Sequence, residues 1–123
     1  MLLKFNDFEI KLNLDNSKTS LKLAKLRSFK TQINTWGEEI YFETANLGIK
    51  PDKNARDIVT FGEAAYWCEG HSIAIGFGKT PVSIENEIRL VSKVNVFGNF
   101  NASTKILNNL KKLVNNHIVS IIN

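Results

Sequence analysis

The sequence has very little cysteine and no long apolar run. Its 123 residues include one cysteine, Cys68, so no disulfide can form within the chain. Such usage is typical of the reducing cytosol, and we expect a cytoplasmic protein. No apolar stretch approaches the ~18 residues that a transmembrane helix needs. The chain also becomes polar directly after Phe5, unlike a secretory signal. We therefore expect no membrane partner.

Metal ligands and nucleophiles are also scarce. Of the two histidines, His71 and His117, only His71 has a ligand-type neighbour at close spacing, Cys68. A structural zinc site needs a second such pair, and a cysteine–histidine dyad needs a group that orients the imidazole. The sequence shows neither, so we expect no metal and no cofactor.

A glycine-rich segment, Gly76-Phe77-Gly78-Lys79-Thr80, is similar to the end of a phosphate-binding loop. The complete motif has a glycine five residues before its Gly-Lys-Thr, and Ile73 occupies that position here. Pro81 follows directly and disfavours the helix whose N-terminus would hold phosphate. The pattern therefore excludes a nucleotide site at this loop.

Charge is moderate in amount and uneven in distribution. The net charge is +4, from 16 Lys+Arg against 12 Asp+Glu. Residues 31–70 are acidic, whereas the segments on either side of them are basic. No aromatic residues are interleaved with the lysines of the predicted helices, so we expect solvated helix faces and no nucleic-acid partner. The acidic middle segment favours a neutral or cationic ligand.

Hydrophobic periodicity predicts short strands and two helices. The apolar run at 2–5 and the period-two alternation from Phe8 to Leu14 predict an N-terminal hairpin. A first helix of about three turns is expected after Asp15-Asn16-Ser17, which offers capping side chains. Apolar residues on one helical face from Ile106 to Val114 predict a second helix, capped by Asn101 or Ser103. Further strands are expected at 33–44, 58–61, from 66, 72–77, 91–97 and 118–122.

These elements indicate one domain over residues 1–123. A chain that is 43% hydrophobic and this short builds one core and has no room for a second. The predicted strands number about seven or eight, and they would make an antiparallel sheet too long to lie flat in so small a domain. We expect a mostly β fold: a small closed or nearly closed antiparallel β-barrel, with two helices capping its ends.

A set of aromatic and polar residues forms the candidate site. Packing in the core is one interpretation, since buried tryptophan and tyrosine bring large apolar area. The other is a groove with aromatic walls and a carboxylate at its edge, which suits peptides or small amphipathic ligands. Strand register decides whether Glu38 or Glu39 faces that groove. The candidate ligand-binding residues are Trp36, Glu38, Glu39, Tyr41, Tyr66, Trp67, Phe77, Lys79, Thr80 and Asn95.

Several of these residues lie in blocks that carry a family resemblance. The first block is Asn34–Phe42. The second consists of Gly62, Tyr66-Trp67, Gly70 and Phe77–Ser83, and the third of Ser92, Val94-Asn95-Val96 and Gly98, in that order. Together they resemble the small prokaryotic cyclophilin-like proteins of unknown function, of the Thermotoga maritima type. The resemblance covers roughly residues 33–98, and it implies a compact β-barrel with helices at its ends.

The resemblance does not bring an isomerase site with it. True cyclophilins are peptidyl-prolyl isomerases whose site uses an arginine in a Phe-His-Arg type of motif. The arginines of this chain are Arg27, Arg56 and Arg89, and none stands in such a motif. The block around Trp36 offers two acids instead, so ordinary isomerase chemistry is not expected.

The leading functional hypothesis is therefore a module that binds a peptide or a small ligand. One alternative is an enzyme, either an atypical prolyl isomerase in which Lys79 or a tyrosine hydroxyl donates, or an amide-handling activity. Another is a structural or subunit role, in which the aromatic residues form an interface. A raised pKa of a groove carboxylate would favour acid–base work. The sequence leaves the oligomeric state open.

Overall fold

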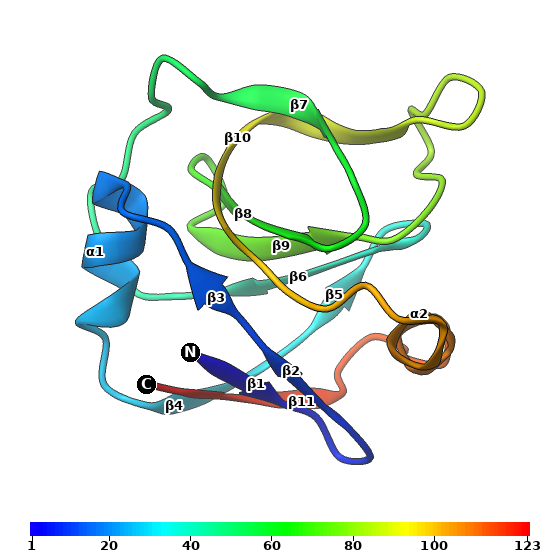
Figure 1. Ribbon diagram of the computed structural model, residues 1–123, viewed down its shortest axis with the longest axis horizontal. Helices are drawn as coiled ribbons and strands as arrows, with labels where there is room; N and C mark the ends of the chain where they lie inside the picture. The colour runs from blue at the N-terminus through cyan, green and yellow to red at the C-terminus, as the bar shows by residue number, and fades with distance from the viewer.

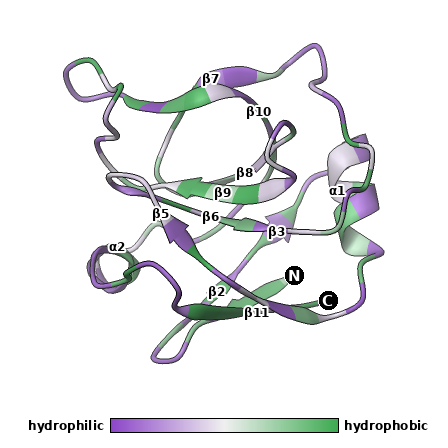
Figure 2. Ribbon diagram, turned by 180° about the vertical axis from the view of Figure 1, so that it is seen from behind, coloured by the Kyte–Doolittle hydropathy of each residue, from purple (hydrophilic) through white to green (hydrophobic).

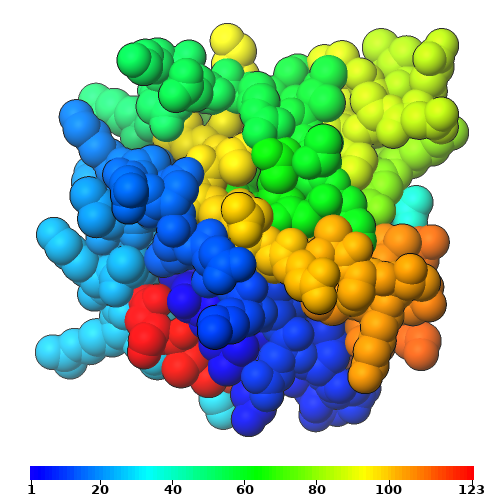
Figure 3. Space-filling model, in the orientation of Figure 1, coloured from blue at the N-terminus to red at the C-terminus, as the bar shows by residue number.

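The computed structural model describes residues 1–123 as two antiparallel sheets with two helices at opposite sides (Figure 1). One sheet pairs the N-terminal hairpin with the C-terminal strand, so the two ends of the chain lie side by side (Figure 3). In spatial order this sheet consists of β2 (Glu9–Lys11), β1 (Leu2–Lys4), β11 (Ile118–Ile122) and β4 (Phe29–Gln32).

The other sheet has seven strands and carries the candidate site. In spatial order it consists of β3 (Asn13–Leu14), β10 (Ile88–Asn99), β8 (Glu63–Trp67), β9 (Ser72–Gly76), β6 (Glu39–Glu43) and β5 (Asn34–Thr35). The seventh strand, β7 (Arg56–Val59), pairs with the first half of β10. The second half of β10 pairs with β8, so one long strand serves two neighbours.

Two buried residues connect the sheets. Leu12 lies between β2 and β3, and Ile33 lies between β4 and β5. The chain therefore passes from one sheet to the other at two places. The mostly β architecture with two helices is confirmed. The closed or nearly closed barrel is not, because the strand hydrogen bonds divide between two separate sheets at these connections.

The two helices begin at serine caps, as their sequences indicate. Ser17 precedes α1 (Lys18–Ala24), and Ser103 precedes α2 (Thr104–Lys111); each hydroxyl accepts a hydrogen bond from an amide of the first turn. Leu23 of α1 and Leu110 of α2 are fully buried in the main core. Neither helix has the length and apolar content that crossing a lipid bilayer requires.

The main difference from the predicted elements is at residues 33–44. This stretch is not one strand but the hairpin β5–β6, because Gly37 adopts a positive φ of 58° and turns the chain. Strand β4 is not among the predicted strands, because its sequence is mostly polar and has only one apolar residue, Phe29. In the structure its residues alternate between half-buried and exposed. Strand β11 has the predicted bounds.

The seven-stranded sheet buries apolar residues on both of its faces. Alternate residues such as Ile40 and Phe42 point into the main core, and parts of the neighbouring strand β9 are coloured as apolar (Figure 2). The residues between them face the other side, where Ala65 pairs with Ala74. A second, smaller apolar cluster covers that side; its buried members are Val59, Ala65, Leu90 and Val94. We refer to this side as the outer face.

Candidate functional site

A pocket opens on the outer face of the seven-stranded sheet. Its volume is about 200 Å³, and six of its seven lining residues are hydrophobic. The floor of the outer face is low here, because β9 carries the small residues Ala74 and Gly76 opposite Tyr41 and Glu39. The lining residues are Trp36, Glu39, Tyr41, Trp67, Leu90, Val91 and Val94.

Glu39 is the one acidic residue in this lining, and it is only 5% exposed. Burial raises the pKa of its carboxyl from 4.5 to about 7, and no hydrogen bond or positive charge offsets the loss of solvation. A buried carboxyl without such a partner destabilises a fold, and perturbed groups of this kind concentrate at functional sites. The pocket is therefore the candidate functional site.

A tight turn decides that Glu39, and not Glu38, faces the pocket. The amide of Trp36 donates to the carbonyl of Glu39 at 3.0 Å across Gly37. The turn is bonded to the chain after β9, since the Glu38 amide donates to the Lys79 carbonyl at 2.8 Å. The side chain of Glu38 lies against Gly78, outside the pocket lining. The question that the sequence leaves open is thus answered by this turn.

Two aromatic walls of the pocket hold each other in place. The rings of Tyr41 and Trp67 meet edge to face, with centroids 5.6 Å apart and planes at 86°. The indole N–H of Trp67 donates to the hydroxyl of Ser92 at 2.8 Å. Ser92 lies where the pairing of β10 with β7 shifts register, so this irregular stretch orients the indole.

The remaining predicted site residues do not line the pocket. Tyr66 and Phe77 belong to the main core, and the Tyr66 hydroxyl bonds to that of Thr44 at 2.8 Å. Thr80 is buried, and its amide donates to the Ser83 hydroxyl at 3.0 Å. Lys79 is exposed, and the contact it makes with the turn is through its backbone carbonyl. Of the ten candidate ligand-binding residues, the structure therefore brings four together at the pocket: Trp36, Glu39, Tyr41 and Trp67.

Asn95 is buried on the core side, where its amide group ties three segments together. Its Oδ1 accepts from the Asp52 amide at 3.0 Å, and its Nδ2 donates to the Lys50 carbonyl at 2.9 Å and to the Thr19 hydroxyl at 3.1 Å. This network anchors the long loop before β7 to β10 and to α1.

Asn95→Ala is expected to lower the free energy of unfolding by about 2 kcal/mol, because it removes three hydrogen bonds of a buried amide and leaves the buried Thr19 hydroxyl and the partly buried backbone groups of Lys50 and Asp52 without this partner. Urea denaturation measures this loss. The two indole N–H signals in an NMR spectrum should stay near their wild-type positions. Unchanged stability together with shifted indole signals would instead make Asn95 part of the site.

Three pocket residues, Leu90, Val91 and Val94, were not among the predicted site residues. They come from β10, which is far from Trp36 and Trp67 in the sequence. Val91 is 59% exposed although it is apolar, and it lies at the pocket. No sequence pattern distinguishes it from the other valines of the strand, since its exposure follows from the register shift of β10 against β7.

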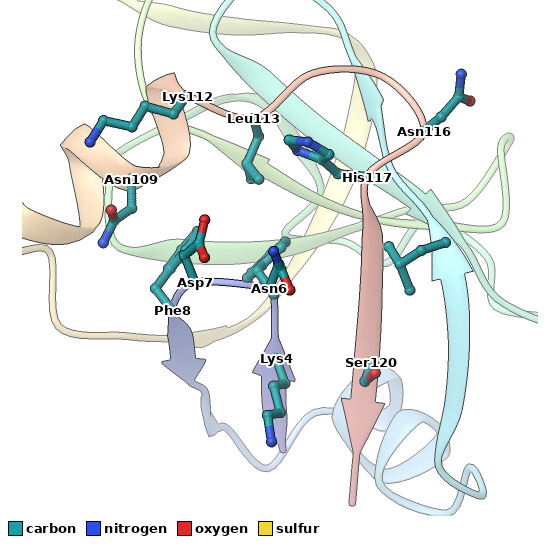
Figure 4. A pocket seen from close by; sticks show the side chains of 12 residues that line it. Lys4, Asn6, Asp7, Phe8, Asn109, Lys112, Leu113, Asn116, His117 and Ser120 are labelled. Atoms are coloured by element: carbon teal, nitrogen blue, oxygen red, sulfur yellow. The ribbon is translucent and has the colours of Figure 1, made fainter.

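A second cavity, of about 500 Å³, lies between the β1–β2 turn, α2 and the start of β11 (Figure 4). Phe5 and Phe8 stack at one side of it, with ring centroids 4.6 Å apart. The lysines, Asp7 and His117 that line it are all exposed. No charged side chain in this lining is buried, whereas Glu39 is only 5% exposed, so the second cavity lacks the feature that distinguishes the Glu39 pocket.

The arginines lie away from the Glu39 pocket. Arg56 pairs with Glu63, and Arg89 pairs with Asp57 at 2.8 Å and with Glu87 at 2.6 Å. These ion pairs fasten β7, β8 and the loop before β10 to one another. No arginine or lysine lines the pocket, so Glu39 has no cationic partner from this chain.

Comparisons with known proteins agree with this architecture. The family model described as Cyclophilin-like matches residues 1–120. The solution structure of the hypothetical protein AF2241 from Archaeoglobus fulgidus is similar at 31% sequence identity and a TM-score of 0.75. The similarity covers 97% of this chain and 90% of the other. A search among curated proteins found no match. By both the family model and the structural relative, the chain belongs to the cyclophilin-like family.

Proposed function

We propose that this chain is a binding module that takes one compact apolar group of a peptide or small molecule into the Glu39 pocket. The observation that carries the proposal is Glu39, which is only 5% exposed and lines an apolar pocket, and whose partly desolvated carboxyl has no hydrogen-bonding or charged partner from the protein. A ligand that offers an N–H group or a positive charge would supply that partner.

The size of the pocket sets the size of the group. An apolar cavity of roughly 150 Å³ accommodates a benzene ring. A pocket of about 200 Å³ therefore suits one ring or one branched aliphatic group, not an extended peptide. The rest of the ligand would lie outside, beside the exposed Val91.

The scaffold supports such a role. Because Leu12 and Ile33 carry the chain from one sheet to the other at two places, we include in the proposal that the two sheets act together as a nearly closed, rigid barrel. Glu39, Tyr41 and Trp67 all lie on its strands. Sites built on strands hold their geometry better than sites built on loops.

One observation favours a second candidate function, that of an atypical prolyl isomerase. Burial raises the pKa of Glu39 to about 7, so its carboxyl takes up a proton close to neutral pH and can then donate a hydrogen bond. A donor aimed at the prolyl nitrogen in a desolvated site is what amide rotation needs. Protein-dependent exchange cross-peaks between cis and trans Xaa-Pro peptides would establish this function, and their absence would exclude it for those peptides.

The binding function is tested with two built-in probes, because both tryptophans of the chain line the pocket. Compact amides, the N-acetyl methylamides of leucine, phenylalanine, proline and lysine, are titrated while the two indole N–H signals are followed by NMR. A group of about seven heavy atoms is expected to saturate both signals with a dissociation constant on the order of 1 mM.

The controls for this titration are Trp36→Ala, which removes one wall of the pocket, and Glu38→Gln, which changes the neighbouring acid outside it. Trp36→Ala should abolish the shift of the remaining indole signal, whereas Glu38→Gln should retain wild-type binding. If neither these amides nor small alkylammonium ions such as choline move the indole signals, the pocket is not a binding site.

A further inference from the structure

We infer that the group bound in the Glu39 pocket is a small alkylated ammonium ion, surrounded by Trp36, Tyr41 and Trp67 and paired with the Glu39 carboxylate. This inference rests on the proposed binding function and names its ligand class. Four features of the pocket support it: its rings, its charge, its shortage of acceptors and its size.

The rings form the first feature. Three of the seven lining residues are aromatic, and two of these are tryptophan, whose ring attracts a cation most strongly. The perpendicular packing of Tyr41 and Trp67 gives the pocket walls in two orientations. Cages of aromatic rings are a common means of recognising quaternary ammonium ions.

The charge is the second feature. Apart from Glu39, the only ionisable group that lines the pocket is the Tyr41 hydroxyl. The neighbouring strands contribute no charge: β9 presents Ala74 and Gly76, β8 presents Trp67, and β10 presents Leu90, Val91 and Val94. A bound cation would therefore be the single counter-charge of a desolvated carboxylate, which is the arrangement in which an ion pair is strong.

The third feature is that the pocket has few hydrogen-bond acceptors, which favours an alkylated ammonium ion over an unsubstituted –NH₃⁺ group. An –NH₃⁺ group has three donors, and the pocket offers acceptors only on Glu39 and Tyr41. A bare ammonium would leave donors facing Leu90 and Val94, at a cost in free energy. Methyl groups on the nitrogen remove those donors and pack on the same apolar side chains. The pocket of about 200 Å³ also matches a group the size of tetramethylammonium.

The test compares the binding of choline with that of 3,3-dimethylbutan-1-ol. This alcohol is the neutral isostere of choline, in which a carbon atom replaces the nitrogen. The two indole N–H signals are followed at about pH 8, where Glu39 is ionised, with sodium chloride balancing the ionic strength. Choline is expected to bind at least tenfold more tightly than its isostere. Glu39→Gln should remove this preference, and Glu38→Gln should keep it.

A second measurement needs no variant. Lowering the pH to about 5.5 protonates Glu39 and should weaken choline binding by about tenfold while leaving the isostere unchanged. Equal binding of choline and isostere at both pH values would overturn the cation inference, and the proposed binding function would stand. Loss of all binding, of amides, choline and isostere alike, would remove both.

The source of the ammonium group is resolved by one further ligand, the methylamide of N-acetyl trimethyllysine. Tighter binding of this compound than of choline would place the group on a protein side chain, with the flanking amides beside Val91. Tighter binding of choline would identify a free small molecule. Either order supports the ligand class, and weaker binding of both than of the neutral isostere contradicts it.

Discussion

Glu39→Gln is expected to stabilise the folded protein by about 3 kcal/mol at pH 8, and by less than about 1 kcal/mol at pH 5. The folded-state pKa of Glu39, about 7, lies above the unfolded value of 4.5, so the folded state binds more protons between these pH values. Stability of the wild type is therefore highest below about pH 4.5 with respect to this group, and it falls as the pH rises to about 7. The neutral carboxamide has no such dependence.

Urea denaturation at a series of pH values measures this difference. Glu38→Gln is the matched control, since it makes the same change one residue away, outside the pocket. Its stability difference from the wild type should not vary over the same range. Parallel pH profiles for wild type and Glu39→Gln would mean that the Glu39 carboxyl is solvated, and the argument for a site at this residue would fail.

Gly37→Ala is expected to lower the free energy of unfolding by about 3 kcal/mol or more and to disrupt the pocket. Gly37 has a φ of +58°, and a Cβ there would lie 2.8 Å from the Lys79 carbonyl oxygen and 2.9 Å from the Thr80 Cα. Both are backbone atoms, so the turn itself must move. Because Trp36 and the Glu38-Glu39 pair flank this glycine, the pocket wall and its carboxyl move with it.

Gly48→Ala separates the two causes of this loss. Gly48 also has a positive φ, +67°, but nothing lies within 4 Å of its Cβ position. Its substitution should cost only about 1 kcal/mol, from the left-handed backbone. Urea denaturation of both variants gives the difference, which measures the close approach of the two loops. Equal losses for the two glycines would show that the loops are not held together as described.

The Glu39 pocket accounts for an apparent conflict between stability and sequence. A glutamine or a leucine at this position would avoid the cost of a desolvated carboxyl, yet the chain has an acid there. Proteins retain such costs where a site needs a charge that the solvent does not screen. This is the physical link between the stability predictions and the proposed ligand class.

Local patterns were sufficient to predict much of the fold. The serine caps and the helical spacing from Ile106 predicted both helices, and strand β11 has its predicted bounds. The blocks around Trp36 and Phe77 indicated the family that the comparisons show. These features depend on residues close together in the chain, which a sequence displays directly.

The site was decided by contacts between residues far apart in the chain. The amino-acid sequence shows that aromatic residues and an acid pair are present, and that no arginine stands in a Phe-His-Arg type of motif. It does not show that the turn at Gly37 directs Glu39 to the outer face, or that Leu90, Val91 and Val94 meet it there; these follow from the folded chain. The reason is register: a shift of one residue reverses the face that a strand side chain occupies, and register is set by long-range pairing.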